Sequence, residues 1–204
     1  MSTKDLILST AKDMISEVGF HKMTTANLAR RADISEGTIY RHFESKEDIL
    51  QHILDTFDQK YLALADQCRT RMNKGTLSFE DLLGSHFAFL DANAADIKIV
   101  LGTYSILELT RRSMGRFIDR LRGLFEEFLA QGIANGTVRD VPLADTGLII
   151  ANMFFGLMRI KLYWPEITDF STEAVAFCRR SLVIDPACPA NPANPANPAA
   201  PEVE

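Results

Sequence analysis

The chain has 204 residues, of which 47% are hydrophobic and 24% charged, and its formal net charge is -5. This composition is that of an ordinary soluble globular protein, and the negative balance excludes nucleic-acid binding through an overall basic surface, so any such site must be local. The cysteines Cys68, Cys178 and Cys188 form no CxxC pair, which argues against a disulfide framework and favours a reducing compartment.

Targeting and membrane signals are weak. The N-terminal segment mixes charged and apolar residues and lacks the apolar run of a signal peptide. The most apolar stretch, residues 146–158, is too short to span a bilayer and is flanked by Asp145, Arg159 and Lys161. We therefore expect a cytoplasmic protein without a membrane partner.

The first elements in the chain are short helices. Apolar residues at helical spacing predict an amphipathic helix over residues 3–18, which Gly19 ends. Thr24 caps a second helix that runs through Ala32. After a tight turn at residues 33–35, Ser35 caps a third helix that is expected to end near residue 43.

A long fourth helix follows, from Ser45 to about Asn73. Its first residues, S-K-E-D, resemble a capping box with Asp in place of the usual Glu or Gln. Beyond it we predict at least five more helices, over roughly residues 78–94, 96–111, 114–135, 142–163 and 171–183. No stretch shows convincing strand alternation, so the predicted fold class is all-α.

The last segment differs in composition. Residues 186–204 carry a proline at every third position up to 201, with Ala and Asn between them. We expect a disordered tail of polyproline II character, although its row of proline rings could also serve a partner. The predicted organisation is a helix-turn-helix domain over 1–50, a larger helical ligand-binding and dimerisation domain over 51–185, and this tail.

The helix-turn-helix is the element that indicates function. In this motif the second helix enters the major groove, and its N-terminal residues reach the base edges. Gly37 has no side chain, so the start of that helix could approach DNA closely. The residues expected at the DNA are those on or beside the second helix: Glu36, Gly37, Thr38, Tyr40, Arg41, His42 and Lys46.

These residues carry a family resemblance. The run T-I-Y-x-H-F-x-S-K over residues 38–46, within about 45 matching N-terminal residues, is similar to the N-terminal domain of the TetR family of transcriptional regulators. The resemblance implies backbone contacts for Thr38, Tyr40, His42 and Lys46, and positions nearest the bases for Glu36, Gly37 and Arg41. Where the family usually has glycine in the turn, this chain has Asp33, which tolerates the left-handed conformation.

The resemblance further implies a homodimer that binds double-stranded DNA and a small apolar ligand. The function that the resemblance implies for this protein is that of a repressor, which the ligand releases from a palindromic operator. The last two long helices, about 142–163 and 171–183, would pair across the two-fold axis, and Gly147 and Ala151 would allow close packing there or in an ordinary core. The polar candidates for a pocket among the aromatic helices are His86, Tyr104, Glu108 and Asn152.

One alternative function remains open. Residues 1–50 hold seven basic and eight acidic residues, so the motif could be a structural corner in a helical ligand-binding or adaptor protein without DNA activity. An enzyme is not expected, because the chain lacks HxxxH, GxSxG, GxGxxG and P-loop patterns. The cysteines have no metal-site spacing either, so no metal or other cofactor is predicted.

Overall fold

The computed structural model describes residues 2–164, 166 and 170–184. Within them the chain is all-α, as predicted, apart from one isolated bridge between Val138 and Val183. The tail at 186–204 and Cys188 lie outside the described residues. The helices are α1 (Thr3–Val18), α2 (Thr25–Arg31), α3 (Glu36–Tyr40), α4 (Lys46–Asn73), α5 (Phe79–Ala92), α6 (Ala94–Thr103), α7 (Glu108–Ala134), α8 (Leu143–Tyr163) and α9 (Ser171–Leu182).

Side-chain caps begin helices α2, α3 and α4 where the sequence predicts them. The hydroxyls of Thr24, Ser35 and Ser45 each accept a hydrogen bond from the backbone N–H three residues on. The cap of α4 is not a capping box, because the Asp48 carboxylate accepts from the Glu44 N–H instead of the Ser45 N–H. Asp33 has a φ of 53°, the left-handed conformation expected of it in the turn.

Three predicted boundaries are wrong. The third helix ends at Tyr40, before residue 43, and a break at residues 104–107 separates α6 from α7, which begins at Glu108. No proline or glycine lies at 104–107 to signal this break. The Thr103 hydroxyl bonds back to the Ile99 carbonyl at 2.7 Å and to the Thr110 hydroxyl at 3.2 Å, so the break is stabilised by a contact between the two helices.

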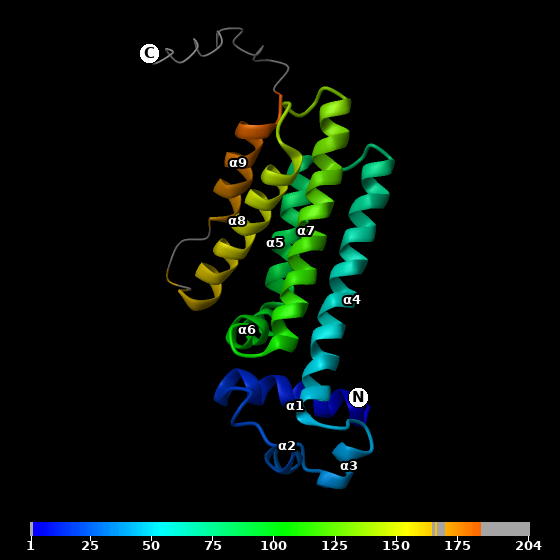
Figure 1. The fold of residues 1–204 in the computed structure, drawn as a ribbon, viewed down its shortest axis with the longest axis vertical. Coiled ribbons are helices and arrows are strands. Elements are labelled where there is room, and N and C mark those ends of the chain that lie inside the picture. The colour runs from blue at the N-terminus through cyan, green and yellow to red at the C-terminus, as the bar shows by residue number, and fades with distance from the viewer. Residues whose placement is uncertain (1, 165, 167–169, 185–204) are drawn as a thin grey trace, which may run out of the picture.

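The helices form two parts joined by α4. Helices α1 to α3 make a small unit at one end, and the long α4 runs from it alongside the remaining helices (Figure 1). Helix α7 packs against both α4 and α8, and α1 contacts α6. A single hydrophobic core runs from Ile7 and Ile39 in the small unit to Tyr61, Phe125 and Phe154 in the larger one. Full burial of such a side chain contributes roughly 1.5–3 kcal/mol.

Helix α8 is unusually apolar for its degree of burial. By length and composition alone it could cross a membrane, yet only 28% of its most apolar window is buried within this chain. A core or interface helix of a water-soluble protein meets the same criteria, and α8 packs along α7 (Figure 1). The apolar surface that this helix leaves uncovered is therefore a candidate contact with another chain.

Candidate DNA-binding surface and ligand cavity

Helix α3 is held by two buried anchors. Ile39 is fully buried and Phe43 is 2% exposed, so both side chains belong to the core of the small unit. The side of α3 that carries Glu36 and Tyr40 is consequently turned to solvent, and the Tyr40 ring is 55% exposed. A tyrosine hydroxyl on an exposed face can form a hydrogen bond with a DNA phosphate.

Exposed hydrogen bonds order the polar groups of this face. The Thr25 hydroxyl donates to Glu36 Oε1 at 2.5 Å and lies 3.2 Å from the Tyr40 hydroxyl. Arg41 donates to the Thr38 hydroxyl at 3.0 Å. Sequence reasoning missed Thr25, because its role depends on the angle at which α2 meets α3. Its position directly after the capping residue was the only local signal.

Lys46 is placed differently from the expectation of a free phosphate-binding group. Its ammonium lies 3.4 Å from the Phe20 carbonyl oxygen, 3.5 Å from that of Met23, and 4.7 Å from the centroid of the Phe20 ring. Lys46 thus ties the start of α4 to the segment between α1 and α2. It would reach a phosphate only by exchanging these weak, long contacts for one with DNA.

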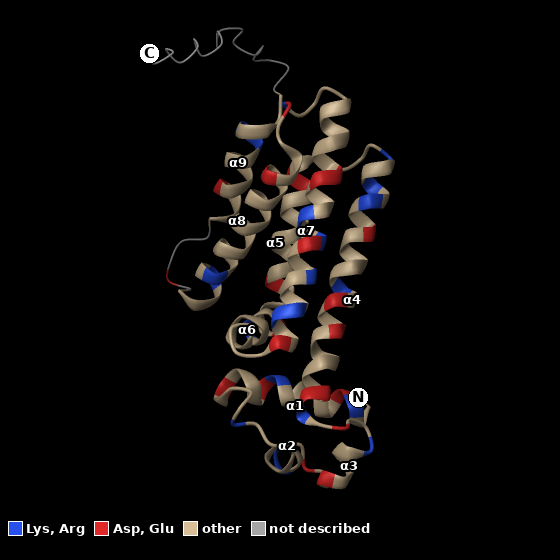
Figure 2. Ribbon diagram, in the orientation of Figure 1, with Lys and Arg blue, Asp and Glu red and all other residues tan. Residues whose placement is uncertain are grey.

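The charges around the motif are mixed (Figure 2). Arg31 forms a two-bond ion pair with Glu17, and the hydrogen bond from Arg31 lowers the pKa of that carboxyl. Arg30 donates to the Asn27 side chain. His42 is exposed, like Arg41, at the end of α3. The positive charge available to DNA is therefore local, as the net charge of the chain indicates.

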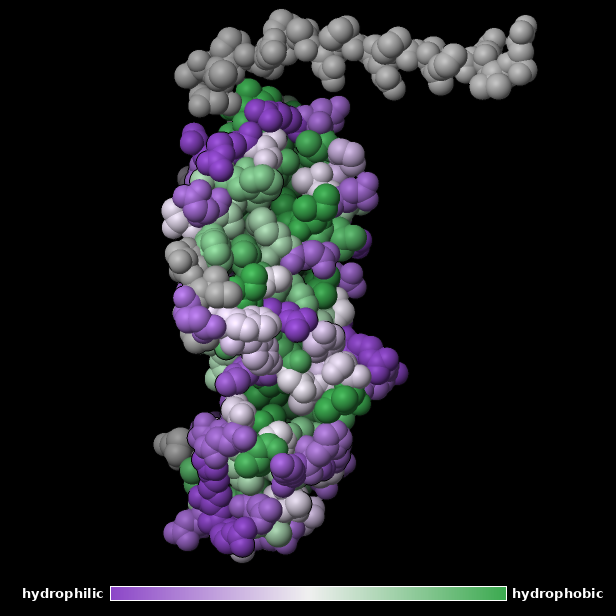
Figure 3. All heavy atoms as spheres, turned by 90° about the vertical axis from the view of Figure 1, so that its left-hand side faces the viewer, coloured by the Kyte–Doolittle hydropathy of each residue, from purple (hydrophilic) through white to green (hydrophobic). Residues whose placement is uncertain are grey.

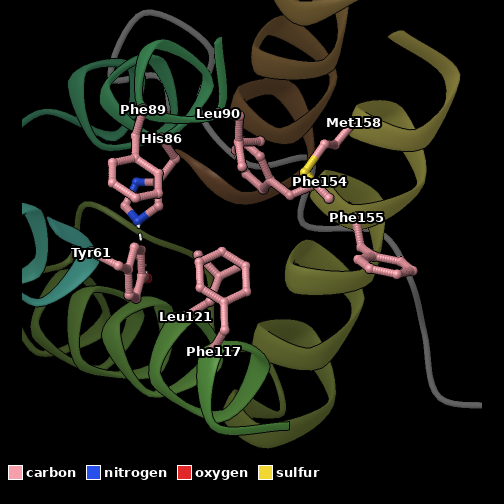
Figure 4. Close-up of a pocket in the computed structure, with 9 residues that line it drawn as sticks. All are labelled: Tyr61, His86, Phe89, Leu90, Phe117, Leu121, Phe154, Phe155 and Met158. Atoms are coloured by element: carbon pink, nitrogen blue, oxygen red, sulfur yellow. Dashed lines mark hydrogen bonds between the residues drawn. The ribbon is translucent and has the colours of Figure 1, made fainter. Parts of the chain in front are cut away.

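A second candidate site lies among the aromatic helices (Figure 4). His86 Nδ1 is 2.7 Å from the Leu82 carbonyl, so this nitrogen carries the proton and Nε2 accepts from the Tyr61 hydroxyl at 3.3 Å. Burial lowers the pKa of His86 to about 4 and raises that of Tyr61, so both groups are neutral at pH 7. An uncharged, apolar site results.

Side chains fill almost all of the space at this site. Two small cavities, each of about 10 Å³, share Phe117 and Met158 as common wall residues. The first is lined by Tyr61, His86, Phe89, Leu90, Phe117, Leu121, Phe154, Phe155 and Met158. A volume of this size holds about one water molecule, whereas ligand sites usually offer roughly 300–1,000 Å³. A ligand would have to displace the shared side chains.

Of the four predicted pocket residues, only His86 lines this cavity. Tyr104 is half-buried and does not line the cavity. Its ring lies edge-on to that of the lining residue Phe155, with 6.4 Å between the centroids. Glu108 is exposed and pairs with Arg112 at 2.8 Å, and the exposed Asn152 donates to the Leu148 carbonyl. The structure thus places Glu108 and Asn152 outside the cavity, because both face solvent on their helices. Tyr61, which was not among the predicted residues, supplies a polar group to the cavity in their place.

The small residues of α8 face the core. A Cβ atom at Gly147 would lie 2.9 Å from Glu126 Cγ and 3.3 Å from the Arg122 carbonyl oxygen, both on α7, and Ala151 is 1% exposed. Gly147 and Ala151 therefore pack in the core of the chain and not against a second copy.

The outer face of α8 and α9 instead presents large apolar side chains. Leu148 is 43%, Ile149 68% and Phe177 59% exposed. Figure 3 shows hydrophobic residues gathered on this side of the molecule.

A metal site requires several ligating side chains that lie close together. In the part of the chain that the structure describes, no group of three or more His, Cys, Asp or Glu side chains is arranged to hold a metal ion. Cys68 and Cys178 are both buried free thiols, and burial raises the pKa of each.

Known proteins match this chain in sequence and in fold. A family model described as bacterial regulatory proteins of the tetR family matches residues 7–53. The fatty acid metabolism regulator protein of Bacillus subtilis is 28% identical over 146 residues, which cover 68% of this chain and 73% of that protein. The transcriptional regulator QacR of Staphylococcus aureus is 28% identical over 167 residues, covering 78% and 85%.

A solved structure shares the fold almost end to end. The SmeT–triclosan complex superposes with a TM-score of 0.74 at 15% identity, covering 97% of this chain and all of that one. At this identity the likeness concerns the fold alone. The sequence match to the family model thus covers the helix-turn-helix, and the likeness in fold extends over nearly the whole chain.

Proposed function

Because the chain belongs to the TetR family and is a helix-turn-helix transcriptional regulator, we propose that it represses transcription from a palindromic operator until a largely apolar small molecule releases it. The observation that carries the DNA-binding part is α3 itself. Its buried anchors Ile39 and Phe43 leave Glu36, Tyr40 and Arg41 exposed on one polar face.

In this proposal the DNA contacts divide into two kinds. Glu36, Gly37 and Arg41 lie nearest the bases and set the sequence preference. Thr38, Tyr40, His42 and Lys46 bind the phosphate backbone and set the register. Family members act as dimers, and the exposed side chains Leu148, Ile149 and Phe177 support a homodimer through α8 and α9. Two recognition helices related by a two-fold axis require a palindromic operator.

The ligand enters the cavity between Tyr61 and Phe154. The neutral His86 and the aromatic lining support an uncharged, largely apolar molecule, since a buried charge would find no counter-ion there. Tyr61 lies on α4, the same helix that begins at Lys46 beside the DNA-binding unit. Displacement of Tyr61 by a ligand would therefore move the far end of a continuous helix and change the spacing of the recognition helices. As a DNA-bound regulator, the protein would work in the cytoplasm.

Binding to DNA that flanks its own gene tests the first step. An electrophoretic mobility shift with that DNA should show specific retention at physiological salt, and footprinting should reveal two symmetric half-sites. Absence of retention under any condition would favour a helical ligand-binding or adaptor protein instead. A single asymmetric half-site would contradict the dimeric mode of binding.

Reciprocal titration tests the second step. A ligand that releases DNA must bind the DNA-incompetent state more tightly, so operator DNA should weaken ligand binding by the same factor, about 5- to 150-fold. Calorimetry with and without operator measures this factor. Equal affinity in both experiments would exclude release by that ligand and leave DNA binding untouched.

A further inference from the structure

A groove of about 410 Å³ lies at the boundary between the helix-turn-helix unit and the larger helical part, away from the core cavity. Its walls come from the end of α1 and the segment after it, from α6 and the turn that follows, and from Tyr163 at the end of α8. These three segments lie on the same side of the molecule (Figure 1). The volume is within the range of small-molecule sites.

The charges of the groove are of one sign. Lys22 and Lys98 line it, and no Asp or Glu is among its described lining residues, although the chain has 27 acidic and 22 basic residues. Neither lysine forms an ion pair with the residues that the structure describes. Helices α1 and α6 end here, and each C-terminus contributes about half a negative charge. Two full lysine charges outweigh these partial ones, so the groove favours an anion.

The rest of the wall is apolar and exposed. Val18, Ile106 and Tyr163 are 46%, 55% and 40% exposed, and all three line the groove. Apolar side chains that converge beside cations favour a ligand with an apolar part next to its charge, because the first part gains from burial and the second from ion pairing.

We propose that this groove is a second effector site, which binds an amphipathic anion: an anionic head near Lys22 and Lys98, and an apolar part against Ile106 and Tyr163. The inference goes beyond the release of DNA through the core cavity. Since α1 belongs to the DNA-binding unit and α6 to the larger part, an occupant contacts both. It therefore favours one placement of the two parts and changes the affinity for DNA.

A larger side chain at Gly102 would block the groove and so test whether it binds a ligand. It lines the groove on α6, and a Cβ atom there meets nothing within 4 Å, so Gly102→Leu should fill the groove without disturbing the helix. Gly115 of α7 is a matched control, because it is also helical, exposed and open around its Cβ position. The double substitution Lys22→Gln with Lys98→Gln removes the charge and keeps the shape.

The probe is sodium 1-octanesulfonate, titrated calorimetrically into the full chain without DNA. Binding should weaken about tenfold or more in Gly102→Leu and in the double lysine variant, and remain unchanged in Gly115→Leu. Added salt should weaken sulfonate binding, and uncharged 1-octanol should show no dependence on either lysine.

Failure of the probe to bind, or equal sulfonate binding in the wild type and the double lysine variant, would overturn the proposal. The lysine variant decides the question even if Gly102→Leu fails to fold. Because the titration contains no DNA, its outcome is independent of whether the protein represses at a palindrome. A mobility shift with the sulfonate present then measures the effect on DNA affinity.

Discussion

Lys12 of α1 and Asp96 of α6 form an ion pair, with 2.5 Å between Nζ and Oδ1, across the boundary between the DNA-binding unit and the larger helical part. Asp96 is 4% exposed, and its other oxygen accepts from Lys60 of α4 at 3.0 Å. One buried carboxylate therefore binds three helices together. A change in the position of α6 or α4 must alter this contact and so be transmitted to α1.

Removal of this carboxylate should loosen the boundary. Asp96→Asn leaves Lys12 and Lys60 without their counter-ion, and because both lysines are partly exposed we expect a loss of about 1–3 kcal/mol in the free energy of unfolding. Urea unfolding measures it. Glu108→Gln, which breaks an exposed pair with Arg112, is the control and should leave the midpoint unchanged. Equal midpoints for all three proteins would show that Asp96 does not join the helices energetically.

Lys46→Ala should weaken binding to all operator variants alike. A phosphate contact carries no sequence information, so the slope of log affinity against log salt should fall by about one. Glu36→Gln should instead change which sequence is preferred. Lys74, at the opposite end of α4, provides a control, and Lys74→Ala should bind as the wild type does. An unchanged affinity and slope for Lys46→Ala would mean that its ammonium stays on the Phe20 and Met23 carbonyls in the complex.

His86 should make stability fall in acid. Its pKa is lowered on folding from 6.5 to about 4, so its contribution is present above pH 6.5 and is lost as the pH falls towards 4. We expect the wild type to lose roughly 2–3 kcal/mol more than His86→Gln between pH 7 and 4.5. Urea unfolding at the two pH values measures the difference. Parallel losses in the wild type and His86→Gln would show that His86 is solvated.

Ile149→Asp should dissociate the homodimer. The side chain is 68% exposed on α8, and a carboxylate buried between two copies would lack a partner. Analytical ultracentrifugation should show monomers, and operator affinity should fall because two linked half-sites are lost. Ile106→Asp, at an apolar position with 55% exposure in the turn after α6, should remain dimeric. A dimeric Ile149→Asp would place the interface elsewhere.

Much of the DNA-binding unit could be predicted from the sequence alone. The capping roles of Thr24, Ser35 and Ser45 and the left-handed Asp33 all agree with the expectation. Caps, turns and helical spacing depend on residues within about four positions of one another. A short motif therefore contains the information that determines its own shape.

The packing of the larger helical part depends on contacts between segments that are distant in the sequence. Gly147 faces α7, Tyr61 meets His86 across 25 positions, and Lys46 reaches carbonyls 23 and 26 residues away. The spacing of an amphipathic helix indicates a buried face, but it does not identify the neighbour that buries it. For this reason the sequence identified an apolar helical domain, and only the tertiary packing showed which of its residues line the cavity, which join the parts and which remain exposed for a second chain.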